Sequence, residues 1–219
     1  MQHKFTAVIL DMDGLLLDTE PVYKAAWQQG AQTLGFKLSD QLCDEFSGNS
    51  LQAIEQRLKQ LFGAQFEFNT FMRLSTDYWY EMIATHGVQP MPGAHLLLKK
   101  LQDNNIAYAL ATNSPDHIAD HCLTHASLEK EFSVRVTSNE VAQSKPAPDI
   151  YSLAMQKLNT PAHQCLCVED SLPGIQSAHH AGGITALVSV NLKPDSTSNQ
   201  INYHFASLNE LVDKLLDSG

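Results

Sequence analysis

Most of the short β-rich runs in this chain are apolar throughout, without alternation of polar and apolar residues, and this feature restricts its fold most strongly. The runs are FTAVIL (5–10), IAYALAT (106–112), VRVT (134–137), CLCV (165–168) and TALVSV (185–190). Strands that are covered on both faces of a parallel sheet have this pattern. Helical patterns separate the runs from about Ala94 onward. The alternation predicts an α/β fold with a Rossmann-like, doubly wound parallel sheet.

Three helices of this α/β part can be placed from their apolar stripes or their first residues. Leucines over 96–101 form one stripe, and a second helix is predicted to follow Asp149 as its N-cap. The last helix is predicted to begin at Ser207, with Glu210 at the spacing of a capping box.

The stretch from about residue 18 to residue 86 interrupts the alternation, because it contains helical patterns and almost no strand pattern. The apolar runs of the α/β part resume after MPGA (91–94). We therefore expect an α/β core domain formed by residues 1–17 and 88–219. An all-α domain over residues 18–87 is expected as an insertion into it.

Composition limits the partners that this chain can have. Its 219 residues, 43% of them hydrophobic, suffice for one core and a small second domain. The net charge of −10 argues against nucleic acid or an anionic membrane as the main partner, and no run approaches the roughly 20 apolar residues of a membrane helix. The 4 Cys form no disulfide or zinc framework, and no signal peptide is visible. We expect a monomeric, cytoplasmic protein with reduced thiols.

Polar residues that could carry chemistry follow the apolar runs at the points where strands would end. Ligands of such folds bind at the carboxyl ends of the strands, so these residues should meet along one edge of the sheet. They are Asp11 and Asp13 after the first run, Thr112 and Asn113 after the second, Glu169 and Asp170 after CLCV, and Lys145 in SKPAPD.

The predicted edge would hold four carboxylates, which repel one another in a cleft unless a cation lies between them. Carboxylate oxygens select a hard cation, and Mg²⁺ shares its ligands with substrate phosphates. Lys145 would add a second positive charge, so a dianionic phosphate fits between the ion and the lysine. One aspartate could then attack phosphorus, and the other could protonate the leaving oxygen.

Four segments resemble the four motifs of the haloacid dehalogenase superfamily, phosphatase branch: DMDGLLLDTE, ATNS, SKPAPD and VEDSLPGIQSAHHAG. The resemblance covers the whole core, and the order and spacing of the four motifs make it specific. The position of the insertion matches the small helical cap of the first cap class in that superfamily.

This resemblance implies a role for each of the core residues. Asp11 would be the nucleophile and a Mg²⁺ ligand. Asp13 would be the acid/base and would bind Mg²⁺ through its main-chain carbonyl. Asp170 would ligate Mg²⁺, with Glu169 in support through water. Thr112, Asn113 and Lys145 would hold the phosphoryl group. Asp13 also argues against a dehalogenase, since displacement of halide needs no second carboxylate.

The resemblance leaves two related activities open. This chain resembles both phosphatases and β-phosphoglucomutases. The mutases, however, carry an arginine in the cap at the position of Leu51 and a histidine in the hinge at the position of Tyr23. The chain also resembles the pseudouridine-5′-phosphatase group. These features favour a Mg²⁺-dependent phosphatase of a small sugar, nucleoside or other metabolite phosphomonoester, with a phosphomutase as the alternative. A binding protein without catalytic activity is disfavoured because all the expected polar residues are present.

Two further assignments concern specificity and helix capping. The cap loop with Gly48, Asn49 and Ser50 is the candidate for substrate specificity. Ser114, before Pro115, is predicted to cap the next helix. Histidines at 117, 121 and 125 have a spacing that can bind zinc, but no carboxylate completes such a site, and an exposed helix face is expected.

Overall fold

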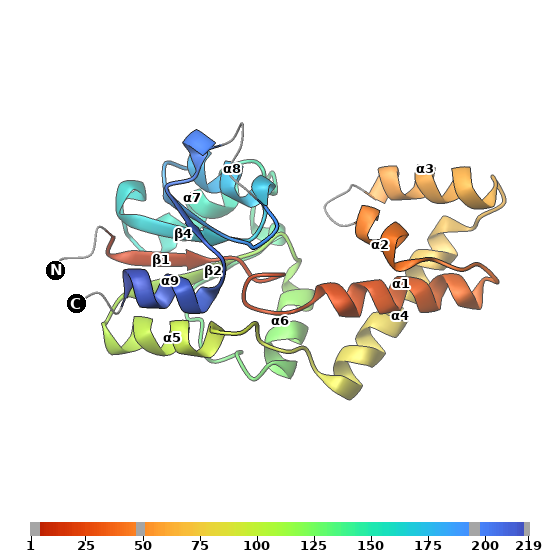
Figure 1. Cartoon of the computed structure of the whole chain (residues 1–219), viewed down its shortest axis with the longest axis horizontal. Coiled ribbons are helices and arrows are strands. Elements are labelled where there is room, and N and C mark those ends of the chain that lie inside the picture. Colours follow the sequence, from red (N-terminus) through yellow and green to blue (C-terminus); the bar gives the residue numbers. More distant parts are fainter. Residues whose placement is uncertain (1–4, 47–50, 193–197, 217–219) are drawn as a thin grey trace. The chain divides into compact units, whose positions relative to one another are not determined.

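The computed structural model describes residues 5–46, 51–192 and 198–216. The chain divides into two compact units (Figure 1). The first unit contains Met1–Asp18 and Gln89–Gly219, and the second contains Thr19–Val88.

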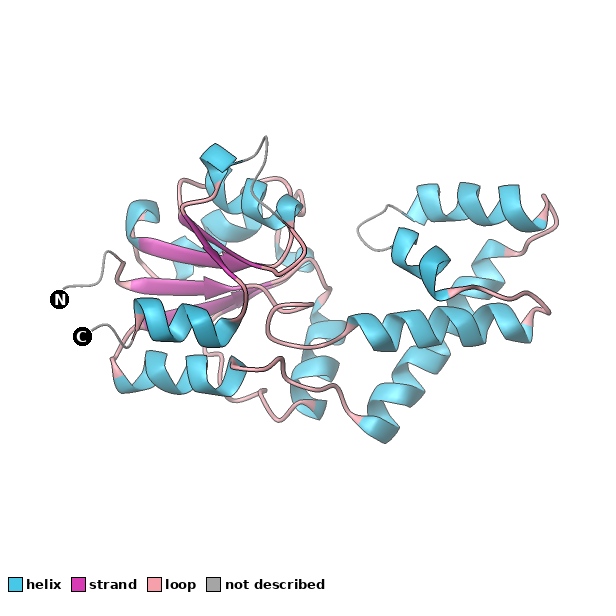
Figure 2. Cartoon of the chain, in the orientation of Figure 1, coloured by secondary structure: helices cyan, strands magenta, loops and turns pink. Residues whose placement is uncertain are grey.

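A six-stranded sheet forms the centre of the first unit (Figure 2). Its order is β3-β2-β1-β4-β5-β6, and every neighbouring pair is parallel. The predicted doubly wound α/β fold is thus confirmed, and each of the five apolar runs overlaps a strand. The sixth strand was not predicted. The strands are β1 (Ala7–Leu10), β2 (Ala107–Ala111), β3 (Arg135–Val136), β4 (Cys165–Glu169), β5 (Ile184–Val188) and β6 (Tyr203–Phe205).

Helices cover the sheet of the first unit and bury its strands. The α7 and α8 helices share a buried cluster with side chains from one face of the sheet, including Ile9 and Cys167. The α5 helix packs against β2 and α9. The strand interiors therefore lie away from water, which explains their unbroken apolar runs. The helices are α5 (Ala94–Asp103), α6 (Asp116–His125), α7 (Asp149–Lys157), α8 (Leu172–His180) and α9 (Leu208–Leu215), with short 3₁₀ turns at Ser138–Glu140, Ala162–Gln164 and Ser198–Gln200.

Two predicted helix starts differ in detail from the structure. The N-cap of α7 is Pro148, and the Asp149 carboxylate accepts from the Gln143 main-chain N–H at 3.2 Å, so the prediction of Asp149 as the N-cap was wrong. Ser207 does cap α9, because its hydroxyl accepts from the Glu210 N–H. The capping box is not formed as predicted, because the Glu210 carboxylate accepts from the main-chain N–H of Ala206, at 2.6 Å, and not from that of Ser207.

The second unit contains four helices in its described part: α1 (Glu20–Thr33), α2 (Asp40–Phe46), α3 (Leu51–Phe62) and α4 (Phe68–His86). The α1 and α4 helices pack closely where Gly30 faces Ser75, since a Cβ on Gly30 would lie 2.3 Å from the Ser75 hydroxyl oxygen. A cluster of buried apolar residues, several of them aromatic, holds the other helices together. Phe36 and Phe62, for example, have ring centroids 4.7 Å apart.

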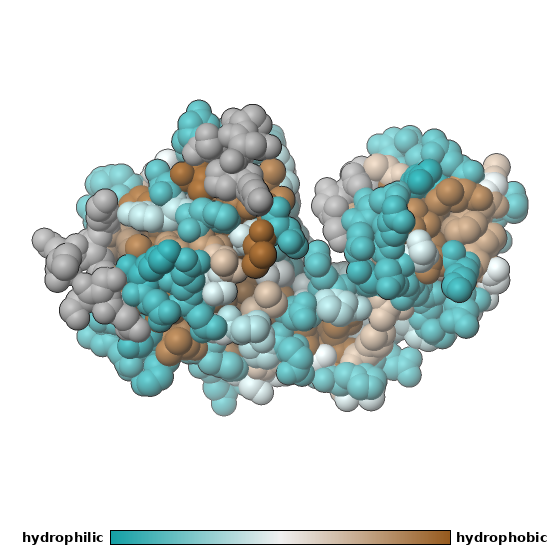
Figure 3. Space-filling view, in the orientation of Figure 1, coloured by the Kyte–Doolittle hydropathy of each residue, from teal (hydrophilic) through white to brown (hydrophobic). Residues whose placement is uncertain are grey.

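The described residues expose few large apolar side chains. Hydrophilic side chains cover most of the face in Figure 3, and the large apolar residues that are exposed are Leu51, Leu61, Leu96 and Val190. None of the helices in the described ranges is both long enough and apolar enough to cross a membrane. All the cysteines are buried free thiols, and burial raises the pKa of Cys122 to about 12.

Candidate active site

The segment after β1 forms a tight loop that requires a glycine. The main-chain N–H groups of Leu16 and Leu17 both donate to the Met12 carbonyl at 3.0 Å, and Gly14 closes the loop with a φ of +82°. A Cβ on Gly14 would lie 2.2 Å from a carboxylate oxygen of Asp170, which follows β4. The glycine of DMDG therefore permits the turn and lets the ends of β1 and β4 approach each other.

Asp11, Lys145 and Glu169 form a buried ion network at this edge of the sheet. The Lys145 Nζ lies 2.5 Å from Asp11 Oδ1, 2.6 Å from Glu169 Oε1 and 2.8 Å from the Ala111 carbonyl oxygen. The Lys145 side chain is only 4% exposed. Because an ammonium group has three hydrogens, these acceptors account for all of them. We call Asp11, Lys145 and Glu169 the ion network below.

Glu169 is held in place by Ser171 and by Tyr151, and the sequence did not single out Tyr151 for the site. The Tyr151 hydroxyl donates to Glu169 Oε1 at 2.6 Å, and the Ser171 hydroxyl donates to Oε2 at 3.1 Å. The Tyr151 ring also lies 5.1 Å from the Lys145 Nζ. A Cβ on Gly174 would lie 1.9–2.1 Å from the Glu169 carboxylate, so a glycine is required beside it. These contacts occupy both Glu169 oxygens and favour a supporting role for this residue.

The electrostatics of the ion network follow from burial. Burial raises the pKa of Asp11 well above its usual value, the Lys145 charge opposes this shift, and the neighbouring carboxylates add to it. Burial lowers the pKa of Lys145, but attraction to Asp11 and Glu169 outweighs burial and raises it above its usual value. Lys145 therefore keeps its proton, and the site has more carboxylates than positive groups. Such a site attracts a cation.

Asp13 points one carboxylate oxygen at the residues that follow β2. Its Oδ2 accepts from the Thr112 hydroxyl at 3.2 Å and from the Ser114 hydroxyl at 2.8 Å. Within the described part of the chain, its buried Oδ1 has no hydrogen-bond partner. The prediction that Ser114 caps α6 was wrong, because the N-cap of that helix is Pro115 and no side chain caps it.

Asn113 joins the loop after β2 to the loop that carries Lys145. Its side-chain oxygen accepts from the Lys145 main-chain N–H at 2.9 Å, and its side-chain nitrogen donates to the Lys145 carbonyl at 3.3 Å. The structure thus brings together residues that lie 32 positions apart in the sequence. Asn113 is exposed.

The acidic residues have the composition and spacing of a site for a hard cation. Asp11, Glu169 and Asp170 each offer a carboxylate oxygen, and these atoms lie within 4.8 Å of one another. The unpartnered Oδ1 of Asp13 lies at the same edge of the sheet. Oxygen donors alone, in an electronegative and partly buried setting, suit Mg²⁺.

Among the described residues, the candidate metal site is the acidic group, and the α6 histidines are not part of it. The His121 and His125 rings lie 4.3 Å apart, and His125 Nδ1 contacts the main-chain oxygen of His121 at 2.9 Å. His117 is exposed, whereas the other two are partly buried.

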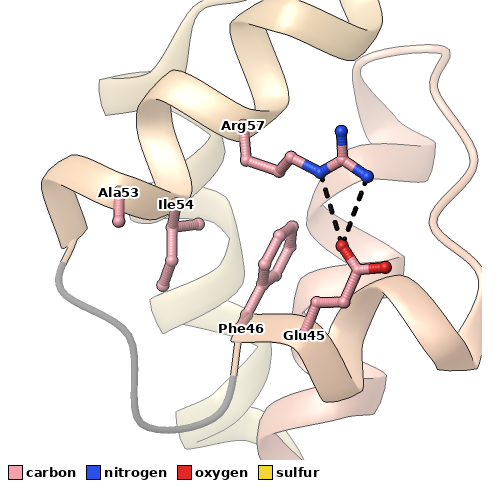
Figure 4. Close-up of a pocket in the computed structure, with 5 residues that line it drawn as sticks. All are labelled: Glu45, Phe46, Ala53, Ile54 and Arg57. Carbon is pink, nitrogen blue, oxygen red and sulfur yellow. Dashed lines mark hydrogen bonds and ion pairs between the residues drawn. The ribbon is translucent and has the colours of Figure 1, made fainter.

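The predicted specificity residues Gly48, Asn49 and Ser50 lie outside the described residues. Described residues of the second unit line a cavity of about 340 Å³ (Figure 4). Its lining includes the buried Phe46 and an ion pair in which Arg57 donates twice to one Glu45 oxygen, at 3.3 Å. The full lining is Glu45, Phe46, Ala53, Ile54 and Arg57.

Comparison with known proteins decides the family. Residues 8–188 match the family model described as haloacid dehalogenase-like hydrolase. The chain belongs to this family. The similarity seen in the four motifs is thereby confirmed, and the chain is an enzyme of the hydrolase class.

Three relatives illustrate the family's range. The chain is 30% identical to "Fructose-1-phosphate phosphatase YqaB" of Escherichia coli, over 83% of this chain and 95% of the relative. It is 30% identical to a candidate pseudouridine-5′-phosphatase of Drosophila melanogaster, over 82% and 79% of the two chains. The crystal structure of a candidate β-phosphoglucomutase from Thermotoga maritima superposes with a TM-score of 0.84 at 26% identity, over 98% of this chain and 100% of the other.

Proposed function

We propose that this hydrolase is a Mg²⁺-dependent phosphatase that cleaves a small phosphomonoester through an aspartyl-phosphate on Asp11. The observation that carries the proposal is the ion network, in which a buried, protonated Lys145 lies 2.5 Å from a buried Asp11 carboxylate. Such an arrangement holds a nucleophile and a positive charge where a phosphoryl group can enter. The names of the relatives support a sugar phosphate, or a nucleoside or other metabolite phosphate, as the substrate class.

The acidic residues are proposed to hold the cation. Asp11, Asp170 and the main-chain carbonyl of Asp13 would be its ligands, with Glu169 in support. When bound, Mg²⁺ would supply positive charge to the oxygens of the transferring phosphoryl group.

In the first step, an Asp11 oxygen attacks phosphorus while the bond from phosphorus to the leaving oxygen breaks. Asp13 gives its proton to that leaving oxygen, so the alcohol departs neutral. Thr112, Asn113 and Lys145 are proposed to hold the phosphoryl oxygens during the transfer.

In the second step, Asp13 takes a proton from a water molecule as the water oxygen attacks phosphorus. The bond between phosphorus and Asp11 breaks, inorganic phosphate leaves, and both carboxyl groups return to their starting state. Loss of the Asp11 charge in the intermediate frees one Lys145 hydrogen for a phosphoryl oxygen.

The proposal is tested by phosphate release from a panel of sugar phosphates, nucleoside monophosphates, phosphoglycolate, fructose 1-phosphate and pseudouridine 5′-phosphate. Wild-type protein and Asp11→Asn are assayed with Mg²⁺ and with a chelator. Release that requires Mg²⁺ and is lost in Asp11→Asn is expected. Release that is equal in the two proteins would contradict the proposal.

A phosphomutase is the second candidate, favoured by the structural similarity to the candidate β-phosphoglucomutase. Leu51 and Tyr23 oppose it, because they replace the arginine and histidine that the mutases carry. Tyr23 instead lies in an aromatic group, with its ring centroid 5.5 Å from that of Trp79. Conversion of β-glucose 1-phosphate to its 6-phosphate, without net phosphate release, would establish the mutase.

Further assignments remain predictions. They are the role of the second unit as a cap, the specificity role of Gly48, Asn49 and Ser50, the monomeric state, the cytoplasmic location, and the exclusion of nucleic acid and membrane partners. Size-exclusion chromatography with light scattering checks the oligomeric state directly.

A further inference from the structure

We propose that Ser114 is a positioning residue that holds the acid/base Asp13 by one oxygen and leaves its other oxygen for proton transfer. The proposal rests on the phosphatase function above. The Ser114 hydroxyl donates to Asp13 Oδ2 at 2.8 Å, although the two residues are 101 positions apart in the sequence. This contact is shorter than the 3.2 Å bond from Thr112 to the same oxygen.

Thr112 cannot perform this task alone during the reaction. A hydroxyl has one hydrogen, and Thr112 donates it to Asp13 while its oxygen accepts from the Ser114 main-chain N–H at 3.0 Å. If Thr112 donates to a phosphoryl oxygen, as its proposed role requires, its bond to Asp13 is lost. The Ser114 hydroxyl is then the donor that remains on Oδ2.

The two Asp13 oxygens differ in a way that fits this assignment. Oδ2 accepts two hydroxyl hydrogens and is the oxygen that the neighbouring side chains hold. In the described structure, Oδ1 is buried and without a partner. Oδ1 has no competing bond within this part of the chain, so it is the oxygen left for proton transfer to the leaving oxygen.

A role in helix capping does not account for Ser114. The first turn of α6 receives a hydrogen bond from elsewhere, since the Asp116 N–H donates to the Asn139 side-chain oxygen at 2.9 Å. The Ser114 side chain is partly buried and turns to Asp13 instead. Its effect should therefore appear in proton transfer and leave helix stability little changed.

The test compares Ser114→Ala and Ser114→Thr with wild type on two substrates, an alkyl or sugar phosphate and p-nitrophenyl phosphate. The first leaving group needs a proton from Asp13, whereas p-nitrophenolate leaves without one. We expect kcat/KM of Ser114→Ala to fall about 10- to 100-fold on the sugar phosphate, because the hydrogen bond to the carboxylate that forms as Asp13 gives up its proton is lost. On p-nitrophenyl phosphate, kcat/KM of Ser114→Ala should fall less than about 3-fold, which is less than the loss of a typical neutral hydrogen bond would cause. Ser114→Thr keeps the hydroxyl and should recover most of the loss.

Ser207→Ala is the matched control, because it removes a serine hydroxyl that caps α9 in the same unit. It should lower the unfolding temperature without changing the ratio of the two kcat/KM values. An equal fall on both substrates in Ser114→Ala, or no fall on either, would overturn the positioning role.

A crystal structure of Ser114→Ala separates this proposal from the phosphatase function. Movement of the Asp13 carboxylate, or a second conformer of it, is expected. An unmoved Asp13 would overturn the positioning role even if phosphatase activity is established. Wild-type protein that is inactive on both substrates would contradict the proposed function, and the Asp13 conformation would still decide the positioning claim.

Discussion

Two ion pairs, one in each unit, show two different uses of charge in this molecule. In the first unit, the Lys145 and Asp11 side chains are 4% and 9% exposed and lie 2.5 Å apart. In the second unit, Arg57 and Glu45 are 46% and 45% exposed and lie 3.3 Å apart. Exposed pairs contribute little to stability, whereas buried charges are costly unless each has its partners.

The difference indicates which of the two charged pairs is the candidate for chemistry. Burial of the ion network is costly for folding, so a functional reason for keeping it there is expected. The Arg57–Glu45 pair of the second unit lies at the surface, and the buried cluster of its described residues is apolar. The predictions below test this contrast.

The largest effect is expected for Asp11→Asn. Loss of the nucleophile should lower phosphate release by at least about a thousandfold. Stability should change little, because burial raises the pKa of Asp11 and the folded protein holds its charged form at a cost. Calorimetry in a chelator should give an unfolding temperature that is at most about 4 °C below that of wild type, and it can be higher. A shift of this size corresponds to about 1 kcal/mol. A collapse of stability would instead mean that Asp11 is mainly structural.

Lys145→Met should lower both activity and stability. It leaves the buried Asp11 and Glu169 carboxylates uncompensated, which costs about 3–5 kcal/mol, or roughly 10 °C. Mg²⁺ should restore part of the loss in stability, because it binds the same carboxylates. Arg57→Met is the matched control in the second unit, and its exposed pair should cost less than about 1 kcal/mol. Equal losses for the two variants, measured by denaturant unfolding, would remove the contrast between the units.

Gly174→Ala should be the more damaging of two glycine substitutions. Its Cβ would meet the Glu169 carboxylate at about 2 Å, so strain of roughly 3 kcal/mol and a loss of activity are expected. Gly35, in the second unit, has a φ of +81° but nothing within 4 Å of a built Cβ. Gly35→Ala should cost only about 1 kcal/mol of backbone strain and leave turnover unchanged. The opposite order in urea unfolding would show that the Glu169 environment is not tightly packed.

The smallest effects concern two buried serines. The Ser177 hydroxyl donates to the Ala147 carbonyl at 2.5 Å, so Ser177→Ala should cost about 1 kcal/mol. The Ser75 hydroxyl in the second unit is buried without a partner among the described residues, so Ser75→Ala should be neutral or stabilising. Differential scanning fluorimetry checks both, and a large loss for Ser75→Ala would show that a bound water satisfies its hydroxyl.

The sequence predicts the sheet and its chemical edge because both depend on local patterns. Five strands follow from apolar runs, and the position of Asp11 at the end of β1 follows from the carboxyl-end rule. The sixth strand, Tyr203–Phe205, has three residues and a polar central residue, so it lacks the apolar run that predicts the other strands. It forms because β5 offers it a free edge.

Residues that support the site could not be predicted in the same way. Tyr151 has the helical spacing of an apolar core residue, and its bond to Glu169 depends on how α7 packs on the sheet. Ser114 has the sequence context of a helix cap, and its bond to Asp13 depends on the closeness of two loops. Such contacts are properties of the tertiary structure.

The central claim, a phosphoryl group carried by Asp11, is tested most directly by rapid acid quench of the wild-type protein with a ³²P-labelled substrate of the panel. The account predicts label on the peptide that contains Asp11 within the first turnover, its disappearance as substrate is exhausted, and no label on Asp11→Asn. Labelled phosphate released at the full rate, with Asp11 never labelled and Asp11→Asn still active, would contradict it.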